Sequence, residues 1–175
     1  MIYIILGIIL IYFIIIYNYQ IKLLNRYERS KSTISVYLQQ RFDLIPNLVS
    51  IVKEYTAYEE EILQNLVLLR EEYNKNKNLK TAEKLEENCE QLILRVENYP
   101  ELKADTVFKE LSKNLVVAEN QIQAARRAYN HDTMKYNLLI QSFPNNIFSK
   151  ILRWEEKEMF DAEKEAENAV KIKIK

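Results

Sequence analysis

Apolar residues recur at alternating steps of three and four along the stretch from Asp105 to Phe143. This heptad period predicts an amphipathic helix that packs along other helices. At a rise of 1.5 Å per residue the helix is about 57 Å long, so partner helices of similar length must cover its apolar stripe. Only Asp132 interrupts the stripe. Its predicted members are Phe108, Leu111, Leu115, Ala118, Ile122, Ala125, Tyr129, Asp132, Tyr136, Leu139 and Phe143.

The first 21 residues, MIYIILGIILIYFIIIYNYQI, carry no charged side chain. This is about the shortest run that spans a bilayer as a helix, and it has no small-residue cleavage site. We therefore expect residues 1–21 to be a retained transmembrane anchor, with a cleaved signal peptide as the alternative. Tyr17 and Tyr19 lie where an aromatic belt is expected, and cations follow from Lys22 onward. The positive-inside rule then predicts an outside N-terminus and a cytoplasmic body.

Three prolines, Pro46, Pro100 and Pro144, divide the rest of the chain, because each removes a backbone donor from a helix. The apolar spacing predicts that the anchor helix continues to about Arg41. Asp43 then caps a new helix with Pro46 in its first turn, or a single long helix is kinked at Pro46.

Three further segments complete the predicted architecture. A second apolar stripe runs from residue 48 to 73 and ends in the polar run 74–80, and a third covers 82–96. A short helix is expected from Asn146 to Trp154. The tail 155–175 begins as a charged stretch compatible with a helix and ends in an IKIK alternation that is either extended or frayed. We predict an all-α fold: a transmembrane anchor (1–21) continued into an elongated antiparallel bundle of about four helices (22–154), followed by the tail.

Composition narrows the function classes. The 25 basic and 25 acidic residues balance, and no basic stripe with interleaved aromatics is present, so nucleic-acid binding is not expected. The only glycine is Gly7, which leaves no glycine-rich phosphate loop. The single cysteine, Cys89, lies on an apolar helical stripe and is interpreted as a buried structural thiol.

The sole histidine, His131, has no cysteine or second histidine to complete a metal site, and Ala128 occupies the position three residues before it. A di-metal helical bundle requires a glutamate at that position. No serine has an evident base. We therefore expect no catalytic residues, no cofactor and no metal.

Two carboxylates fall on the predicted seams, Glu59 and Asp132. Buried carboxylates require partners, and the cations placed to pair with them are Arg41, Arg70, Arg126 and Arg127. Such pairs set helix register in the simpler interpretation. The alternative is a ligand groove lined by the same groups.

Several blocks of the chain resemble the LemA family in their order and spacing. They are residues 40–49 (QRFDLIPNLV), positions 52, 53, 55, 57 and 59, residues 97–104 (ENYPELKA), 119–122 (ENQI) and 125–127 (ARR), and the pairs 129–130, 136–137 and 143–144. The resemblance assigns motif or structural roles to Arg41, Asp43, Pro46, Asn47, Glu59, Glu97, Asn98, Tyr99, Pro100, Glu119, Asn120, Arg126, Tyr129, Asn130, Tyr136, Asn137, Phe143 and Pro144.

The resemblance implies a bacterial membrane protein with an outside N-terminus and a cytoplasmic helical bundle, in a family without an established enzymatic activity. Some relatives act in the formation of organelle-like membranes in magnetotactic bacteria, and family genes often neighbour a membrane metalloprotease. Both associations point toward envelope organisation or membrane protein quality control.

We predict a non-catalytic, membrane-anchored scaffold or adaptor that contacts the lipid bilayer and protein partners. Exposed aromatic side chains, Tyr37, Tyr58 and Trp154, are the candidate contact residues. Two alternatives remain at this point. One is a ligand-binding or enzymatic bundle that uses the buried Glu, Asp and Arg groups, and the other is a homo-oligomer that shapes the membrane.

Overall fold

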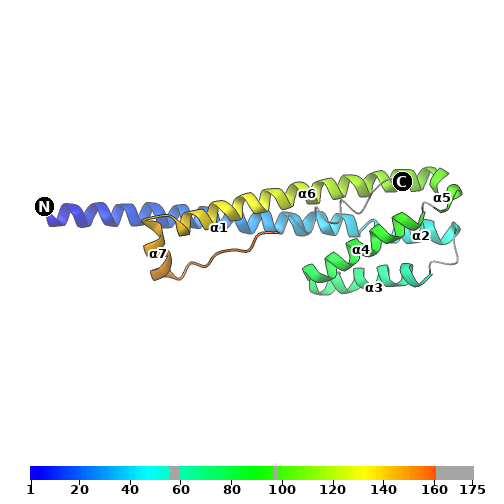
Figure 1. The fold of residues 1–175 in the computed structure, drawn as a ribbon, viewed down its shortest axis with the longest axis horizontal. Coiled ribbons are helices and arrows are strands. Elements are labelled where there is room, and N and C mark those ends of the chain that lie inside the picture. Colours follow the sequence, from blue (N-terminus) through cyan, green and yellow to red (C-terminus); the bar gives the residue numbers. More distant parts are fainter. Residues whose placement is uncertain (56–59, 97, 161–175) are drawn as a thin grey trace. The chain divides into compact units, whose positions relative to one another are not determined.

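The computed structural model of the 175-residue chain describes residues 1–55, 60–96 and 98–160. Within these residues the structure is helical and contains no strand (Figure 1), which confirms the all-α prediction. The long elements are α1 (Ile2–Phe42), α2 (Ile45–Tyr55), α3 (Glu60–Asn76), α4 (Leu79–Val96) and α6 (Thr106–Gln141). A short helix, α5 (Pro100–Ala104), lies between α4 and α6, and another, α7 (Asn145–Leu152), follows α6.

The chain forms two compact units. Unit 1 contains Met1–Ser32 and Ala124–Lys175, and unit 2 contains Thr33–Gln123. Helices α1 and α6 pass from one unit into the other, so each unit contains part of both helices.

In unit 1, α1 and α6 pack in antiparallel directions. The Gln20 side-chain amide lies 3.4 Å from the hydroxyl of Tyr136, and Tyr27 stacks on Tyr129 at a ring-centroid distance of 5.3 Å. Because the partner number falls as the α1 number rises, the two helices run in opposite directions. Their shared core consists of Ile16, Leu23, Tyr136, Leu139 and Ile140, with Leu24, Phe148 and Trp154 packed against it.

Helix α6 confirms most of the predicted seam. Asp105 caps it as expected, since its carboxylate accepts a hydrogen bond from the backbone N–H of Phe108 at 2.8 Å. Two predicted seam members are wrong. Asp132 is half-buried, and the neighbouring Thr133 is the fully buried residue, because the stripe takes a step of four after Tyr129.

The second error is Phe143, which is 80% exposed. Helix α6 ends at Gln141, so Phe143 no longer lies on its seam. The physical reason is Pro144, because the ring of a proline disfavours helical backbone at the residue before it.

The break between α1 and α2 falls at Asp43 and Leu44, and Pro46 lies in the first turn of α2. The backbone N–H groups of the first turn have no partner inside the helix, so proline is tolerated there. The prediction of a new helix is confirmed, and the alternative of one helix kinked at Pro46 is wrong. Asp43 is not the residue next to α2, because Leu44 precedes Ile45, and its carboxylate accepts from Gln39 and Arg70 instead.

In unit 2, α3 packs on α4, α2 packs on α3, and α5 contacts both α2 and α4. Helix α3 ends inside the polar run, as predicted, and Lys77 has a positive φ of 48° in the turn before α4. The α4 stripe is also buried as predicted. Helix α5 was not foreseen. The core side chains include Leu48, Val52, Leu63, Leu66, Tyr73, Ala82, Leu85, Cys89, Leu92, Val96 and Leu102.

Candidate functional site

The motif residues fall into a buried charge cluster and a junction in unit 2, and a tail clamp in unit 1. Two of them, Glu59 and Glu97, lie outside the described residues. Others mark boundaries. Pro100 begins α5, and Phe143 and Pro144 separate α6 from α7. Asn98 and Asn120 are exposed.

The charge cluster is centred on Arg41, whose side chain is 5% exposed on the buried stripe of α1. Its guanidinium pairs with Glu86 of α4 at 3.4 Å and with Glu119 of α6. A buried guanidinium requires such partners, because its desolvation is otherwise too unfavourable. The cluster therefore fixes α1, α4 and α6 in one register within unit 2.

These pairs differ from the predicted ones. Arg41 was expected to meet Glu59 or Asp132, whereas its partners are Glu86 and Glu119. Asp132 lies in unit 1. Glu86 was missed although its spacing gave a signal, since it stands four residues after Ala82 and three before Cys89 on the buried stripe of α4.

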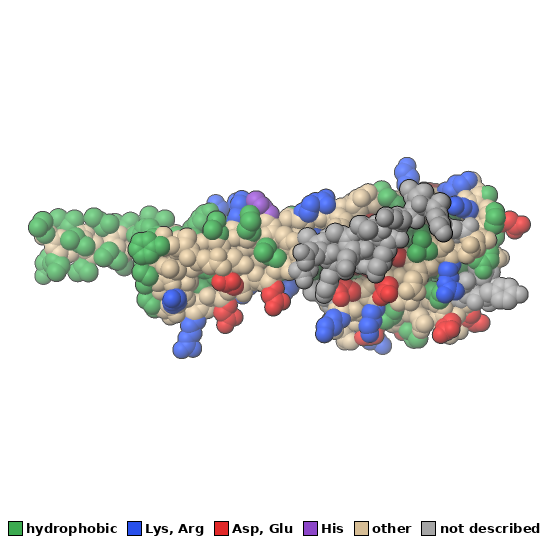
Figure 2. Space-filling model, in the orientation of Figure 1, with side chains coloured by type: hydrophobic (Ala, Val, Ile, Leu, Met, Phe, Trp, Pro, Cys, Tyr) green, Lys and Arg blue, Asp and Glu red, His purple; other side chains and the backbone are tan. Residues whose placement is uncertain are grey.

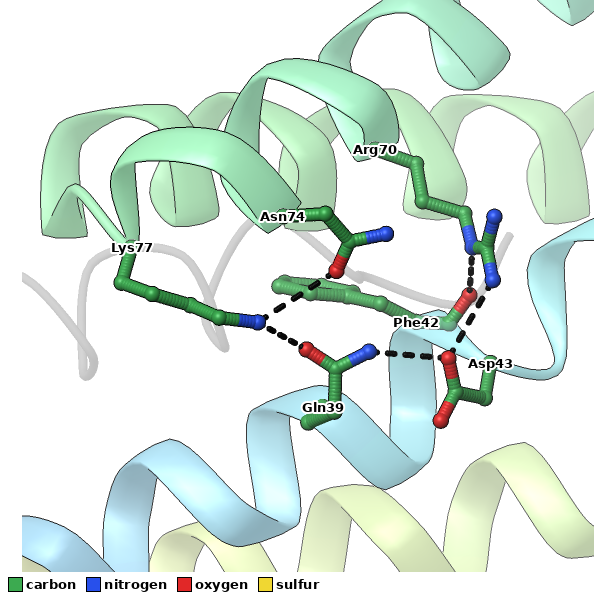
Figure 3. Close-up of polar contacts among 6 residues, drawn as sticks. All are labelled: Gln39, Phe42, Asp43, Arg70, Asn74 and Lys77. Atoms are coloured by element: carbon green, nitrogen blue, oxygen red, sulfur yellow. Dashed lines mark hydrogen bonds and ion pairs between the residues drawn. The ribbon is translucent and has the colours of Figure 1, made fainter.

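The junction where α1 ends is held by α3. The Arg70 guanidinium donates to the backbone carbonyl of Phe42 at 2.9 Å and pairs with Asp43 at 3.2 Å. A carbonyl at a helix C-terminus has no hydrogen-bond donor inside the helix. Arg70 supplies that donor, and its positive charge is favourable at this end of the helix dipole. Figure 3 shows this network, which consists of Gln39, Phe42, Asp43, Arg70, Asn74 and Lys77.

The tail clamp is formed by Asn130 and Asn137 of α6. The Asn137 side-chain amide donates to the carbonyl of Lys157 at 2.8 Å, and its oxygen accepts from the Lys157 N–H at 2.9 Å. Asn130 repeats both bonds with Phe160, at 3.0 and 2.8 Å. Each asparagine thus pairs with one residue of the tail in the way a neighbouring strand would.

The spacing of the clamp follows from two repeat lengths. Seven residues of helix from Asn130 to Asn137 span about 10.5 Å. Three residues of extended chain, from Lys157 to Phe160, span about 10 Å. The two distances match, so both asparagines can pair at once. Residues 155–160 are accordingly not helical, which differs from the helix-compatible interpretation of this stretch.

Aromatic contacts reinforce the clamp. The Tyr129 hydroxyl donates to the carbonyl of Glu158 at 2.9 Å and lies 3.3 Å from the Tyr27 hydroxyl. Burial, and then the Tyr27 hydroxyl, raise the pKa of Tyr129 well above its ordinary value, so it remains a neutral donor. The Phe160 ring stacks edge-on against Tyr129 at 5.0 Å, with the Arg126 guanidinium 5.7 Å from its centroid.

The candidate contact aromatics are less exposed than predicted. Tyr37 is half-buried, Trp154 is half-buried with its ring 6.3 Å from that of Tyr17, and Tyr58 lies outside the described residues. Tyr17 contacts Trp154 because the chain turns back along α1 after α7, which a helical pattern does not reveal. Arg127 and His131 are exposed.

A groove of about 340 Å³ lies in unit 2 between α2 and the start of α6. It combines an apolar floor with amide, hydroxyl and carboxylate groups, and its lining includes the motif residue Asn47. Neither Asp132 nor the arginines predicted to line a ligand groove contribute to it. Its lining residues are Leu44, Asn47, Ser50, Ile51, Val107, Glu110, Leu111 and Asn114. Among the described residues, no group of three or more His, Cys, Asp or Glu side chains is placed to hold a metal ion.

Comparison of the chain with curated proteins gives no match. The sequence profile of the LemA family matches residues 30–174, a range that includes the charge cluster, the junction and the tail clamp. The chain therefore belongs to the LemA family.

Proposed function

We propose that this LemA family protein is a non-catalytic scaffold or adaptor that holds a helical body at the cytoplasmic face of a bacterial cell membrane. The observation that carries the proposal is that large apolar side chains are exposed along the first half of α1. Among the described residues, one helix, at the N-terminus, is long and apolar enough to cross a membrane, and nearly all of its apolar window is exposed.

Exposure of this helix to water is unfavourable. Ile4, Ile8, Ile11 and Ile15 are each 60–68% exposed, on one face of the helix, and their neighbours on the other faces are exposed too. Burying one isoleucine side chain is worth about 1.5–3 kcal/mol, so the total over the exposed side chains of this helix is at least comparable to the stability of a typical domain. A bilayer supplies that burial.

The mechanism of such a scaffold is presentation. Helix α1 continues without a break from Ile2 to Phe42, so the anchor and the helix that enters unit 2 are one element. An anchored body is confined to a thin layer at the membrane. That confinement raises its effective concentration toward other membrane proteins and makes weak contacts productive.

The described motif side chains support a structural role. Arg41 is engaged by two carboxylates, and Asn130 and Asn137 are engaged by the backbone of the tail. These groups maintain the shape of the body. Under the proposal, contact with partners falls to exposed apolar positions such as Val116 and Val117 of α6, which are 61% and 47% exposed.

A photocrosslinking experiment in cells tests the scaffold. A photoreactive amino acid replaces Val116 in the full-length chain, and adducts are identified by mass spectrometry. We expect defined adducts with membrane proteins, which disappear when Ile4→Arg and Ile8→Arg are added to abolish insertion. The matched control carries Lys113→Arg, which leaves the apolar helix intact.

The outcomes separate the alternatives. Adducts with a second copy of the chain alone would favour the membrane-shaping homo-oligomer. Absence of adducts at Val116 and at other exposed positions of the body, with the protein present in membranes, would contradict the scaffold.

A further inference from the structure

Helix α7 and Phe143 before it expose apolar side chains and bury polar ones. Phe143, Ile147 and Ile151 are 80%, 51% and 70% exposed, whereas the polar residues Asn145 and Ser149 are each only 7% exposed. A short helix facing water would turn these groups the other way. Figure 2 shows hydrophobic side chains over the N-terminal end of unit 1, where α7 also lies in Figure 1.

Most buried polar groups of this region are hydrogen-bonded within the protein, and the side-chain oxygen of Asn146 is the exception in α7. The Tyr12 hydroxyl donates to the Asn145 side-chain oxygen at 2.7 Å, and the Asn145 amide donates to the Ser142 hydroxyl at 3.2 Å. The Ser149 hydroxyl donates to the carbonyl of Ile140 at 2.9 Å. Polar groups that are satisfied inside the protein, beneath an apolar outer face, are what a hydrocarbon environment requires.

Charge is distributed in the same sense. The stretch from residue 133 to 154 contains three cations, Lys135, Lys150 and Arg153, and no carboxylate. The first 27 residues, which include all of the anchor, likewise contain only Lys22 and Arg26 as charged side chains. Up to Trp154, both chain segments carry positive charge alone, which complements anionic lipid headgroups, and the exposed Glu155 and Glu156 follow.

The contacts of α7 with α1 indicate how deep α7 lies in the bilayer. Phe148 of α7 lies 6.2 Å from Tyr12 and 5.3 Å from Phe13, measured between ring centroids, and Trp154 lies 6.3 Å from Tyr17. Tyr12 lies ten residues, about 15 Å, before Lys22, the first charged side chain of the chain. A bilayer core is about 30 Å thick, so the level of Tyr12 is inside the core when Lys22 lies at the headgroups.

We propose that α7, with Phe143, is an interfacial helix inserted into the bilayer leaflet on the side of the body, where it binds anionic lipid. The inference rests on the anchor of the proposed function. An interfacial helix buries its apolar face about 5–10 Å into the leaflet. Tyr17 lies five residues, about 7.5 Å, beyond Tyr12 and five residues before Lys22, so the Tyr17–Trp154 pair lies between the depth of α7 and the headgroups. Lys22 and Arg26 follow within the headgroups.

Depth-sensitive fluorescence of the full-length chain tests the proposal. Cysteine replaces Ile147 or Ile151 in a Cys89→Ala background, carries an environment-sensitive dye, and is reconstituted into vesicles of phosphatidylcholine and phosphatidylglycerol. We expect nitroxide lipids to quench both dyes and aqueous iodide to quench them several-fold less than a dye at Val116→Cys. In vesicles of phosphatidylcholine alone, we expect iodide quenching at both sites to increase.

A dye at Ile9→Cys separates this proposal from the anchor. If Ile9 is in lipid while Ile147 and Ile151 are quenched by iodide as strongly as Val116, α7 is not inserted and the anchor stands. If Ile9 is also accessible to iodide, the anchor itself is wrong and the proposal falls with it. Equal depths in both vesicle types would overturn the binding of anionic lipid.

Discussion

Asn137 and Lys157 form a two-bond pair in which a side-chain amide takes the place of a strand. The amide donates to the Lys157 carbonyl at 2.8 Å and its oxygen accepts from the Lys157 N–H at 2.9 Å. Asn130 forms the same pair with Phe160. On the tail, the pair involves only backbone atoms. It therefore holds the tail in an extended conformation independently of the side chains of the tail.

Asn137→Ala is expected to release the tail around Lys157. Each lost hydrogen bond contributes about 0.5–1.5 kcal/mol, so amide hydrogen exchange at Lys157 should accelerate by roughly one to two orders of magnitude. Asn120→Ala, at an exposed position on the same helix, is the control. Unchanged exchange at Lys157 in the Asn137 variant would show that the clamp does not order the tail.

Arg41→Met is expected to destabilise the protein by about 3 kcal/mol, at the low end for a broken buried pair because Glu119 is one-third exposed. The variant leaves Glu86 and Glu119 without the guanidinium between them. Urea denaturation of the detergent-solubilised chain, followed by circular dichroism, measures the loss. Adding Glu86→Gln and Glu119→Gln should restore most of it, whereas Arg127→Met at an exposed position should change little. A triple variant as unstable as Arg41→Met would contradict this role for the charges.

Cys89 is expected to be inert toward thiol reagents in the folded protein. The thiol is buried, and burial raises its pKa to about 12, so almost no thiolate is present at neutral pH. Mass spectrometry after maleimide treatment should show no adduct at pH 7 and complete labelling in denaturant. Rapid labelling of the native chain would show that α4 opens readily.

Asp105 is expected to stabilise α6 in a pH-dependent way. The backbone N–H of Phe108, together with the Tyr55 hydroxyl, holds the pKa of Asp105 below its ordinary value of 3.8. A lowered pKa in the folded state means that the ionised group adds stability above pH 3.8, and that this stability is lost as the pH falls through the lowered value.

Two variants resolve that effect in the same denaturation assay. Asp105→Asn keeps a capping oxygen but no charge, so it should be less stable than the native chain at pH 7 and equal to it once the pH is below the lowered pKa. Asp105→Ala should be less stable throughout. If the difference in stability between the native chain and the Asp105→Asn variant is the same at every pH in this range, the charge of Asp105 is not its cause.

The seams could be predicted because packing along a helix has a fixed period. Steps of three and four located the buried side chains from Phe108 to Tyr129, and then failed at Asp132, where Thr133 is buried instead. Spacings of three and of four residues between buried side chains are equally compatible with a helix. Which spacing occurs at a given position depends on the packing of the partner helix. The prediction that Phe143 is buried failed for another reason. Pro144 disfavours helical backbone at the residue before it, which indicates a helix end before Phe143.

The tail clamp lies beyond such pattern reading. Asn130 and Asn137 were identified by resemblance, yet their partners are backbone atoms of a stretch whose sequence, EEKEMF, is compatible with a helix. A backbone partner leaves no signature in the side chains. Arg41 is an intermediate case, because its pairing with a carboxylate was predicted, while its actual partners, Glu86 and Glu119, depend on how the helices pack in unit 2.

Labelling in intact cells tests the central claim, an anchor with its N-terminus outside and its body in the cytoplasm. Cysteine replaces Tyr3 or Val116, which are 85% and 61% exposed, in full-length Cys89→Ala protein. A membrane-impermeant maleimide should label position 3 in intact cells and position 116 only after permeabilisation. Labelling of position 116 in intact cells, or of both positions only after permeabilisation, would contradict the account.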